Sequence, residues 1–204
     1  MTQPGPQSPA AKGAERRERL LAAATRYIAR NGARGTTLAQ IARTAGVSQS
    51  GLIYHYGTKE DLLHAVLDKR DTADATLRWG DDSPGLQMFD HIVATVRSWS
   101  LSPDAVGMHS VLVAENAGQQ GSIHDRLLSR YWSNIDSVAD VIAQAQERGE
   151  VRKGINARRK AVEIVAFING LETAWLLDPS VPAAETAEQW ARDQVRALRA
   201  GRES

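Results

Sequence analysis

The sequence predicts an all-α protein with a small N-terminal unit of three helices and a larger C-terminal helical domain. Apolar side chains recur at intervals of three and four along most of the 204-residue chain, which is the spacing of one helix face. No segment alternates between apolar and polar residues as a half-buried strand does. Glycine and proline breaks separate the periodic segments. The hydrophobic content of 42% and the charged content of 24% are typical of a globular protein.

The composition also limits the chemistry and the compartment. There is no cysteine, which excludes disulfides, thiolate metal sites and a cysteine nucleophile. No apolar run approaches the length of a bilayer-spanning helix. Residues 1–13, MTQPGPQSPAAKG, are rich in Pro, Gly, Ser and Gln and contain no apolar stretch, so we expect a flexible tail rather than a secretory signal. We therefore expect a cytoplasmic protein that has no contact with a membrane.

Residues 14–70 are predicted to form the first domain, and its charge sets it apart. Residues 1–70 contain 11 basic and 5 acidic side chains, a net charge of +6, whereas the remaining residues contain 14 basic and 19 acidic side chains, a net charge of −5. A basic unit joined to an acidic body is typical of a module that binds a polyanion. Chance clustering is the alternative, which charge alone does not exclude.

Successive helix signals divide this first domain. One apolar stripe precedes a helix stop at Asn31-Gly32, and it consists of Leu20, Ala24, Tyr27 and Ile28. A capping-box spacing from Thr37 to Gln40 begins a short second helix, which ends at Gly46. Ser48 caps a third helix, and a fourth begins near Thr58 and continues to about residue 79. The second and third helices have the layout of a helix-turn-helix.

The third helix divides into two faces. At 100° per residue, Leu52 and Tyr56 lie together and pack inward, whereas Ser50 and Tyr54 lie on the opposite side. The outward face is small and polar, as a helix that enters the major groove of DNA requires, and its hydroxyl and amide groups can contact phosphates and base edges. A core role is an equally good interpretation for His55 and the better one for Tyr56.

The stretch TTLAQIARTAGVSQSGLIYHYGTKEDLL (36–63) closely resembles the DNA-binding region of the tetracycline-repressor (TetR) family of bacterial transcriptional regulators, and RERLLAAATRYIARNGARG (17–35) resembles that family's first helix. The resemblance implies contacts to a phosphate or to the major groove, and for these we expect Thr37, Ser48, Gln49, Ser50, Gly51, Tyr54, His55 and Lys59. Gly51 departs from the family pattern, which commonly has Thr or Ala there, and Ile53 replaces an aromatic residue. Both departures affect the expected base preference.

Residues 71–204 are predicted to form a second, helical domain with segments at about 86–100, 105–117, 122–148, 157–178 and 183–200. The resemblance implies that the last two helices pair with their copies in a homodimer. Apolar stripes on these two helices are the expected interface, with Ile164, Ile168, Leu171 and Trp175 on the first and Trp190, Val195 and Leu198 on the second. The segment 157–178 also carries a stripe of small residues, namely Ala166, Gly170 and Ala174. A core within one subunit is the alternative for all of them.

Aromatic and methionine side chains in the middle helices suggest a ligand pocket, which the family resemblance also implies. The expected pocket residues are Met88, Trp99, Met108, Trp132 and Phe167. For each of them singly, a place in the core is the better interpretation. Polar groups that could orient a ligand are His91, His109, Glu115, Asn116, Asn134 and Asn169.

Together these features predict a ligand-responsive DNA-binding regulator. We expect a repressor that binds a palindromic operator in double-stranded DNA as a homodimer, and that a small apolar or amphipathic effector releases. An enzyme is a weaker alternative. His64 and Asp68 have helical i, i+4 spacing and His124-Asp125 begins a helix, but no third metal ligand, nucleophile motif or phosphate loop accompanies them. We expect no metal and no cofactor. A helical protein-interaction module would not explain the basic first domain.

Overall fold

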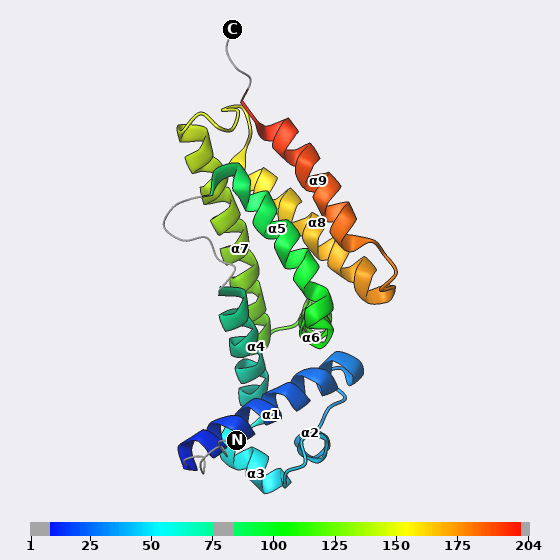
Figure 1. The fold of residues 1–204 in the computed structure, drawn as a ribbon. Helices are drawn as coiled ribbons and strands as arrows, with labels where there is room; N and C mark the ends of the chain where they lie inside the picture. The colour runs from blue at the N-terminus through cyan, green and yellow to red at the C-terminus, as the bar shows by residue number, and fades with distance from the viewer. Residues whose placement is uncertain (1–8, 76–83, 201–204) are drawn as a thin grey trace, which may run out of the picture.

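The computed structural model describes residues 9–75 and 84–200, and within them it is all-α, as predicted. Figure 1 shows a small unit at one end, formed by α1, α2 and α3, and α4 leading from it towards a longer body. The helices are α1 (Pro9–Asn31), α2 (Leu38–Thr44), α3 (Gln49–Tyr56), α4 (Lys59–Ala75), α5 (Met88–Ser98), α6 (Pro103–Asn116), α7 (Ser122–Glu147), α8 (Ala157–Leu177) and α9 (Ala183–Leu198).

The first helix is longer than the sequence predicts. α1 begins at Pro9, so residues 9–13 of the expected flexible tail are helical, and residues 1–8 lie outside the described part of the chain. The apolar stripe of α1 is buried at Leu20, Ala24 and Ile28, and it packs on Leu52 of α3 and Leu62 of α4. This packing holds the small unit together.

The turn between α2 and α3 follows from its capping residues. The Thr37 N–H donates to Gln40 Oε1 (2.7 Å), and the Gln40 N–H donates to Thr37 Oγ1 (3.3 Å), which completes the predicted capping box of α2. Gly46 ends the turn with φ +67°, a conformation that glycine adopts without a Cβ clash. Ser48 Oγ then accepts from the Gly51 N–H (3.1 Å) at the start of α3.

Helices α5 to α9 form the body. Its core contains side chains from α5, α7, α8 and α9, among them Phe89, Ile135, Ile142, Ile164 and Leu198. The predicted segments agree with the observed helices, except that the first of them is divided into a 3₁₀ turn (Gly85–Gln87), α5 and a second 3₁₀ turn (Trp99–Leu101). Residues 76–79, predicted as the end of the fourth helix, lie outside the described residues.

A second core crosses the predicted boundary at residue 70. The apolar cluster of the small unit includes Met108 and Leu112 from α6 and Ile123 from α7, and each of these is buried. The small unit and the body are therefore joined by shared packing as well as by α4. Among the described residues, no helix is both long enough and apolar enough to span a membrane.

Candidate DNA interface and ligand cavity

The outward face of α3 is exposed as the wheel predicts. Leu52 is fully buried and Tyr56 nearly so, whereas Ser48, Gln49 and Ser50 are exposed, and the side chain of Tyr54 is 87% exposed. In Figure 1, α3 lies at the outer end of the molecule, away from the body. A polar face with a projecting tyrosine hydroxyl is therefore open to the groove of a duplex.

The two aromatic residues that follow Tyr54, His55 and Tyr56, make contacts within the subunit. The half-buried His55 ring packs edge to face on Tyr54, with centroids 5.5 Å apart. The Tyr56 hydroxyl donates to the Arg17 carbonyl (3.3 Å), and the Arg17 guanidinium lies over the Tyr56 ring at 5.7 Å. Burial raises the pKa of Tyr56, and the hydrogen bond and charge of Arg17 oppose this rise. Tyr56 therefore has the core role that its position on the wheel indicates.

The remaining expected DNA contacts flank α3. Thr37 is exposed at the start of α2, and Gly51 is half-buried in the first turn of α3. The ammonium of Lys59, in the first turn of α4, donates to the Arg34 carbonyl (3.4 Å). The structure thus gathers Thr37, Lys59 and the outward face of α3 on the same small unit, although they come from three helices.

A cavity of about 820 Å³ lies between α1, α4, α5, α6, α7 and α8. This volume is in the range of small-molecule sites. Trp99 and Met108 line it, as expected, beside other apolar side chains that include Val66, Ile92, Val106, Val138 and Val165. Of the polar residues suggested by the sequence, His109, Asn134 and Asn169 line it, whereas His91, Glu115 and Asn116 do not.

Three of the five expected pocket residues, Met88, Trp132 and Phe167, do not line this cavity. Met88 is buried in the core of the body. Phe167 stacks on Trp190, with centroids 4.1 Å apart and planes inclined by 10°. Trp132 is 42% exposed, and the Arg158 guanidinium lies over its ring at 5.2 Å. Met88 and Phe167 thus pack within the body, and Trp132 lies at its surface, none of which the sequence spacing reveals.

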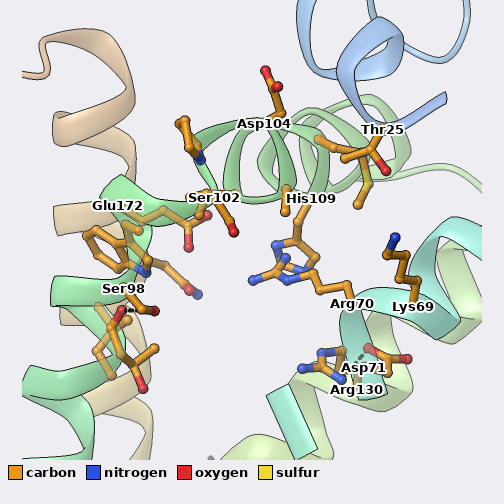
Figure 2. A pocket seen from close by; sticks show the side chains of 18 of the residues that line it. Thr25, Lys69, Arg70, Asp71, Ser98, Ser102, Asp104, His109, Arg130 and Glu172 are labelled. Atoms are coloured by element: carbon orange, nitrogen blue, oxygen red, sulfur yellow. Dashed lines mark hydrogen bonds and ion pairs between the residues drawn. The ribbon is translucent and has the colours of Figure 1, made fainter. Parts of the chain in front are cut away.

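The cavity also has a charged wall that the sequence analysis missed. Lys69, Arg70 and Arg130 line it, and Figure 2 shows Arg70 and His109 among the side chains that surround it. Asp71 lies on the same wall and accepts a hydrogen bond from Arg130, so the negative charge of Asp71 is paired with the positive charge of Arg130. Arg70 belongs to α4 and His109 to α6, which brings two helices to the same point. Glu172 of α8 lies across the cavity and accepts from Ser110.

The His64–Asp68 pair is structural in this geometry. His64 Nε2 lies 2.9 Å from Ser122 Oγ, and the Arg126 guanidinium donates to the His64 carbonyl (3.0 Å). Arg126 also pairs with Asp68 (2.8 Å) and Asp71 (2.6 Å). Burial lowers the pKa of Arg126, but its hydrogen bonds to these two carboxylates raise it by more. The network joins α4 to α7.

The other histidine–aspartate pair is also accounted for. His124 Nδ1 lies 3.0 Å from the Asn116 carbonyl, between α7 and the end of α6. No group of three or more His, Cys, Asp or Glu residues within 9–75 and 84–200 is placed to hold a metal ion. His124 therefore connects the start of α7 to the end of α6.

A glutamate connects the body to the turn before α2. One Glu115 oxygen, Oε2, accepts from the backbone N–H of Ala33 (2.9 Å) and of Arg34 (3.2 Å). The Arg34 guanidinium in return donates to the Glu115 carbonyl (2.5 Å). Because Glu115 lies in the last turn of α6, whose earlier turns line the cavity, these contacts attach a cavity-lining helix to the small unit.

The apolar stripe expected at a dimer interface faces inward instead. Ile164, Leu171 and Leu198 are buried in the core of the subunit, which favours the alternative of a core within one subunit for these three. The other four are partly buried against that core, and Ile168 also lines the cavity: Ile168, Trp175, Trp190 and Val195. The helical period locates an apolar face but does not say which neighbour covers it.

The structure leaves a different face of α8 open. Ala166 and Gly170 are exposed, and a Cβ added at Gly170 would meet no atom within 4 Å. Val162 and Leu177, which are 37% and 83% exposed, lie at the two ends of the same face. This open face contains the predicted stripe of small residues.

Family models match both parts of the chain. The model described as bacterial regulatory proteins, tetR family, matches residues 20–66. The model described as BetI-type transcriptional repressor, C-terminal, matches residues 113–200. The first match contains α2 and α3, and the second contains all of α7, α8 and α9.

Similar proteins cover nearly the whole chain. The HTH-type transcriptional regulator TtgR of Pseudomonas putida is 28% identical over 198 residues, which are 91% of this chain and 92% of TtgR. A TetR-family regulator from Rhodococcus sp., of known structure, is 25% identical, with a TM-score of 0.76, and the likeness covers 90% of this chain and 98% of that one.

NalD, the secondary repressor of the MexAB-OprM multidrug efflux pump in Pseudomonas aeruginosa, has the same fold. It is 21% identical, with a TM-score of 0.72, and the likeness covers 94% of this chain and all of that one. These relatives are regulators of transcription and not enzymes, which removes the catalytic alternative. With its helix-turn-helix unit, its helical body and both family matches, the chain belongs to the TetR family of DNA-binding transcriptional regulators.

Proposed function

We propose that this protein is a repressor that binds a palindromic operator as a homodimer in the cytoplasm and leaves it when a small amphipathic effector enters the cavity. The observation that carries the proposal is the exposed polar face of α3 on a basic unit. A single such helix reads only a few base pairs, so an operator needs two of them in symmetric half-sites. The repressor role of NalD, a protein of the same fold, supports the direction of regulation.

The lining of the cavity supports an effector with an apolar body and an anionic group. Trp99, Met108 and several valines would cover the apolar part. Arg70 and His109 would hold a carboxylate or similar anion, because a guanidinium forms strong charge-assisted hydrogen bonds with such groups. Since these two residues belong to α4 and α6, a ligand that contacts both changes the preferred spacing of the two helices.

The position of α4 links this spacing to the DNA. α4 begins shortly after α3 ends, and Arg126 ties it to α7. A ligand that favours one position of α4 therefore favours one separation of the two α3 helices in the dimer. The ligand lowers operator affinity only by the ratio of its affinities for the two conformations.

The open face of α8 supports a dimer interface. Ala166 and Gly170 would allow a second helix to approach closely, and Val162 and Leu177 would be covered by it. A Gly170→Arg variant should then sediment as a monomer. Gly154→Arg is the matched control, because a Cβ at Gly154 also meets no atom within 4 Å but lies in the loop before α8. A dimer that survives in Gly170→Arg would refute this interface.

Selection of binding sites, a salt series and two single variants test the DNA function. Duplexes selected from a random pool by the purified protein should share a palindrome, and affinity for them should fall steeply as salt rises. Loss of Gln49 as Gln49→Ala should relax discrimination at one base pair by about 1–3 kcal/mol. Loss of Tyr54 as Tyr54→Ala should weaken all duplexes alike if its hydroxyl contacts a phosphate. Negligible effects of both variants would refute the role of α3.

The effector class is tested with two amphiphiles of equal chain length, decanoate and decyltrimethylammonium. Decanoate should raise the melting temperature of the protein and release a fluorescent duplex, whereas the cation should do neither. The Arg70→Gln and His109→Leu variants should reduce the decanoate effect and keep DNA affinity. Release by the cation instead would refute the anionic class and leave the repressor proposal standing.

A further inference from the structure

An arginine from α1 lies against the glycine in the first turn of α3. A Cβ added at Gly51 would be 3.0 Å from Arg16 Nη2 and 3.1 Å from Ser48 Oγ. Contacts this short require the neighbouring group to shift by a few tenths of an ångström, so the guanidinium approaches α3 more closely at Gly51 than it would beside a larger residue. The two residues are far apart in the sequence, and α1 and α3 meet at the outer end of the molecule (Figure 1).

The helical geometry of Gly51 does not itself call for glycine. Gly51 lies inside α3 and is not among the glycines with positive φ. Glycine weakens a helix relative to alanine, most of all in a helix of only eight residues. Close approach of another group, whether DNA or a side chain of the same subunit, is a physical reason for a glycine at such a position. The group that approaches is the Arg16 guanidinium.

Arg16 differs from the neighbouring arginines of α1, because its side chain forms no ion pair or hydrogen bond with another described residue of the subunit. Arg17 lies over the Tyr56 ring, and Arg19 pairs with Glu15 (3.4 Å). Arg16 is exposed and makes no ion pair or hydrogen bond with any residue in the described part of the chain. Its positive charge is therefore available beside the helix that reads DNA, without a carboxylate to compete for it.

We propose that Arg16 is a DNA contact of this protein, that it binds a phosphate of the duplex backbone, and that Gly51 is present to admit it. The inference rests on the DNA binding proposed for α3. A phosphate is the expected partner because α3 itself fills the groove with Gln49, Ser50 and Tyr54, whereas Arg16 approaches from the flank on another helix. Phosphate contacts of this kind fix the register of a protein on DNA without reading sequence.

Salt dependence distinguishes this contact from general charge effects. Each phosphate neutralised by a protein contributes about 0.9 to the slope of log affinity against log salt concentration. The Arg16→Ala variant should reduce that slope by about 0.9 and weaken binding about five- to tenfold, to the same extent on a selected duplex and on a random duplex. Arg16→Lys should retain most of the slope, because a point charge still neutralises the phosphate.

Gly51→Ala tests the pairing of the two residues. The added methyl group pushes the guanidinium away from α3, so this variant should lower the salt slope if the position of Arg16 matters. The double variant Arg16→Ala/Gly51→Ala should bind no more weakly than Arg16→Ala alone, because both changes remove one contact. Gly51→Ala should meanwhile melt at or above the temperature of the parent, provided that Ser48 Oγ, 3.1 Å from the added Cβ, keeps its cap, since alanine favours the helix. Weaker DNA binding in a more stable protein excludes misfolding as the cause.

The control is Arg30→Ala, which removes an equal charge from the other end of α1, where Arg30 faces Asp104 at 3.9 Å. Fluorescence anisotropy over a series of salt concentrations measures all the variants. Arg16→Ala values that coincide with those of Arg30→Ala would overturn the proposal, as would a loss confined to one base pair of the selected duplex. A parent protein that binds neither duplex would instead refute the DNA-binding function itself.

Discussion

Replacing Glu115 with alanine should destabilise the protein by about 2 kcal/mol through loss of the link between α6 and the turn before α2. The Glu115 carboxylate accepts from two backbone N–H groups, at 2.9 and 3.2 Å. A hydrogen bond to a charged group contributes about 1.5–3 kcal/mol, and partial exposure of Glu115 favours the lower end or less. The variant also leaves the N–H of the buried Ala33 without its acceptor, which adds to the cost.

Urea unfolding followed by circular dichroism measures this loss. Glu115→Gln retains one carbonyl oxygen as an acceptor, so about half of the loss should return. In a protein of this size a loss of about 2 kcal/mol corresponds to a fall of about 4–8 °C in melting temperature. Amide hydrogen exchange at Ala33 and Arg34 should quicken in Glu115→Ala, which locates the effect. Glu147→Ala, which removes an exposed carboxylate of α7, is the control, and equal stabilities of the two alanine variants would refute the reasoning.

Three further predictions concern stability. Leu112→Ala should lower the free energy of unfolding by about 2–5 kcal/mol, because the fully buried Leu112 fills the core shared by the small unit and the body, and chemical denaturation will measure the loss. Arg126→Met and Asp71→Asn should each destabilise, but a double-mutant cycle should give less than their sum, since both remove the Arg126–Asp71 ion pair between α4 and α7. Hydrogen bonds from the Thr58 hydroxyl and N–H lower the pKa of Asp61 in the folded protein. The ionised Asp61 therefore stabilises the folded state fully above the usual carboxyl pKa, and this stabilisation is lost as the pH falls through the lowered pKa of the folded state. The melting temperature of Asp61→Asn should lack the part of the fall at acid pH that is due to Asp61. An NMR titration in which the Asp61 carboxyl has its ordinary pKa would contradict this prediction.

Local sequence patterns account for the parts of the fold that depend on near neighbours. The capping box at Thr37 and the burial of Leu52 beside the exposed Tyr54 follow from spacing within one or two helical turns. The all-α class and the approximate helix ends follow from periodicity and from glycine and proline breaks. These features need no knowledge of which helix packs on which.

Features that join distant segments were beyond the sequence. Ile164 and Leu198 lie on apolar faces that were assigned to a partner subunit, yet their own subunit covers them. Phe167 was assigned to the pocket, but α9 supplies a tryptophan that stacks on it. The contact of Glu115 with residues 33 and 34 joins segments far apart in the chain and leaves no local signal. The placement of Arg16 beside Gly51 is of the same kind, although the unusual glycine marked the position.

The core that α6 and α7 share with the small unit also bears on how such regulators can be recombined. Met108, Leu112 and Ile123 would be absent from a fragment ending at residue 70, so that fragment would expose the apolar surface they cover. A chimera that joins this reading unit to the sensor body of a relative would place unrelated side chains against that surface. Such a chimera needs side chains at positions 108, 112 and 123 that fit the apolar surface of the small unit before its DNA binding can respond to a new ligand. A junction placed within α4 alone would divide one packed core between two unrelated proteins.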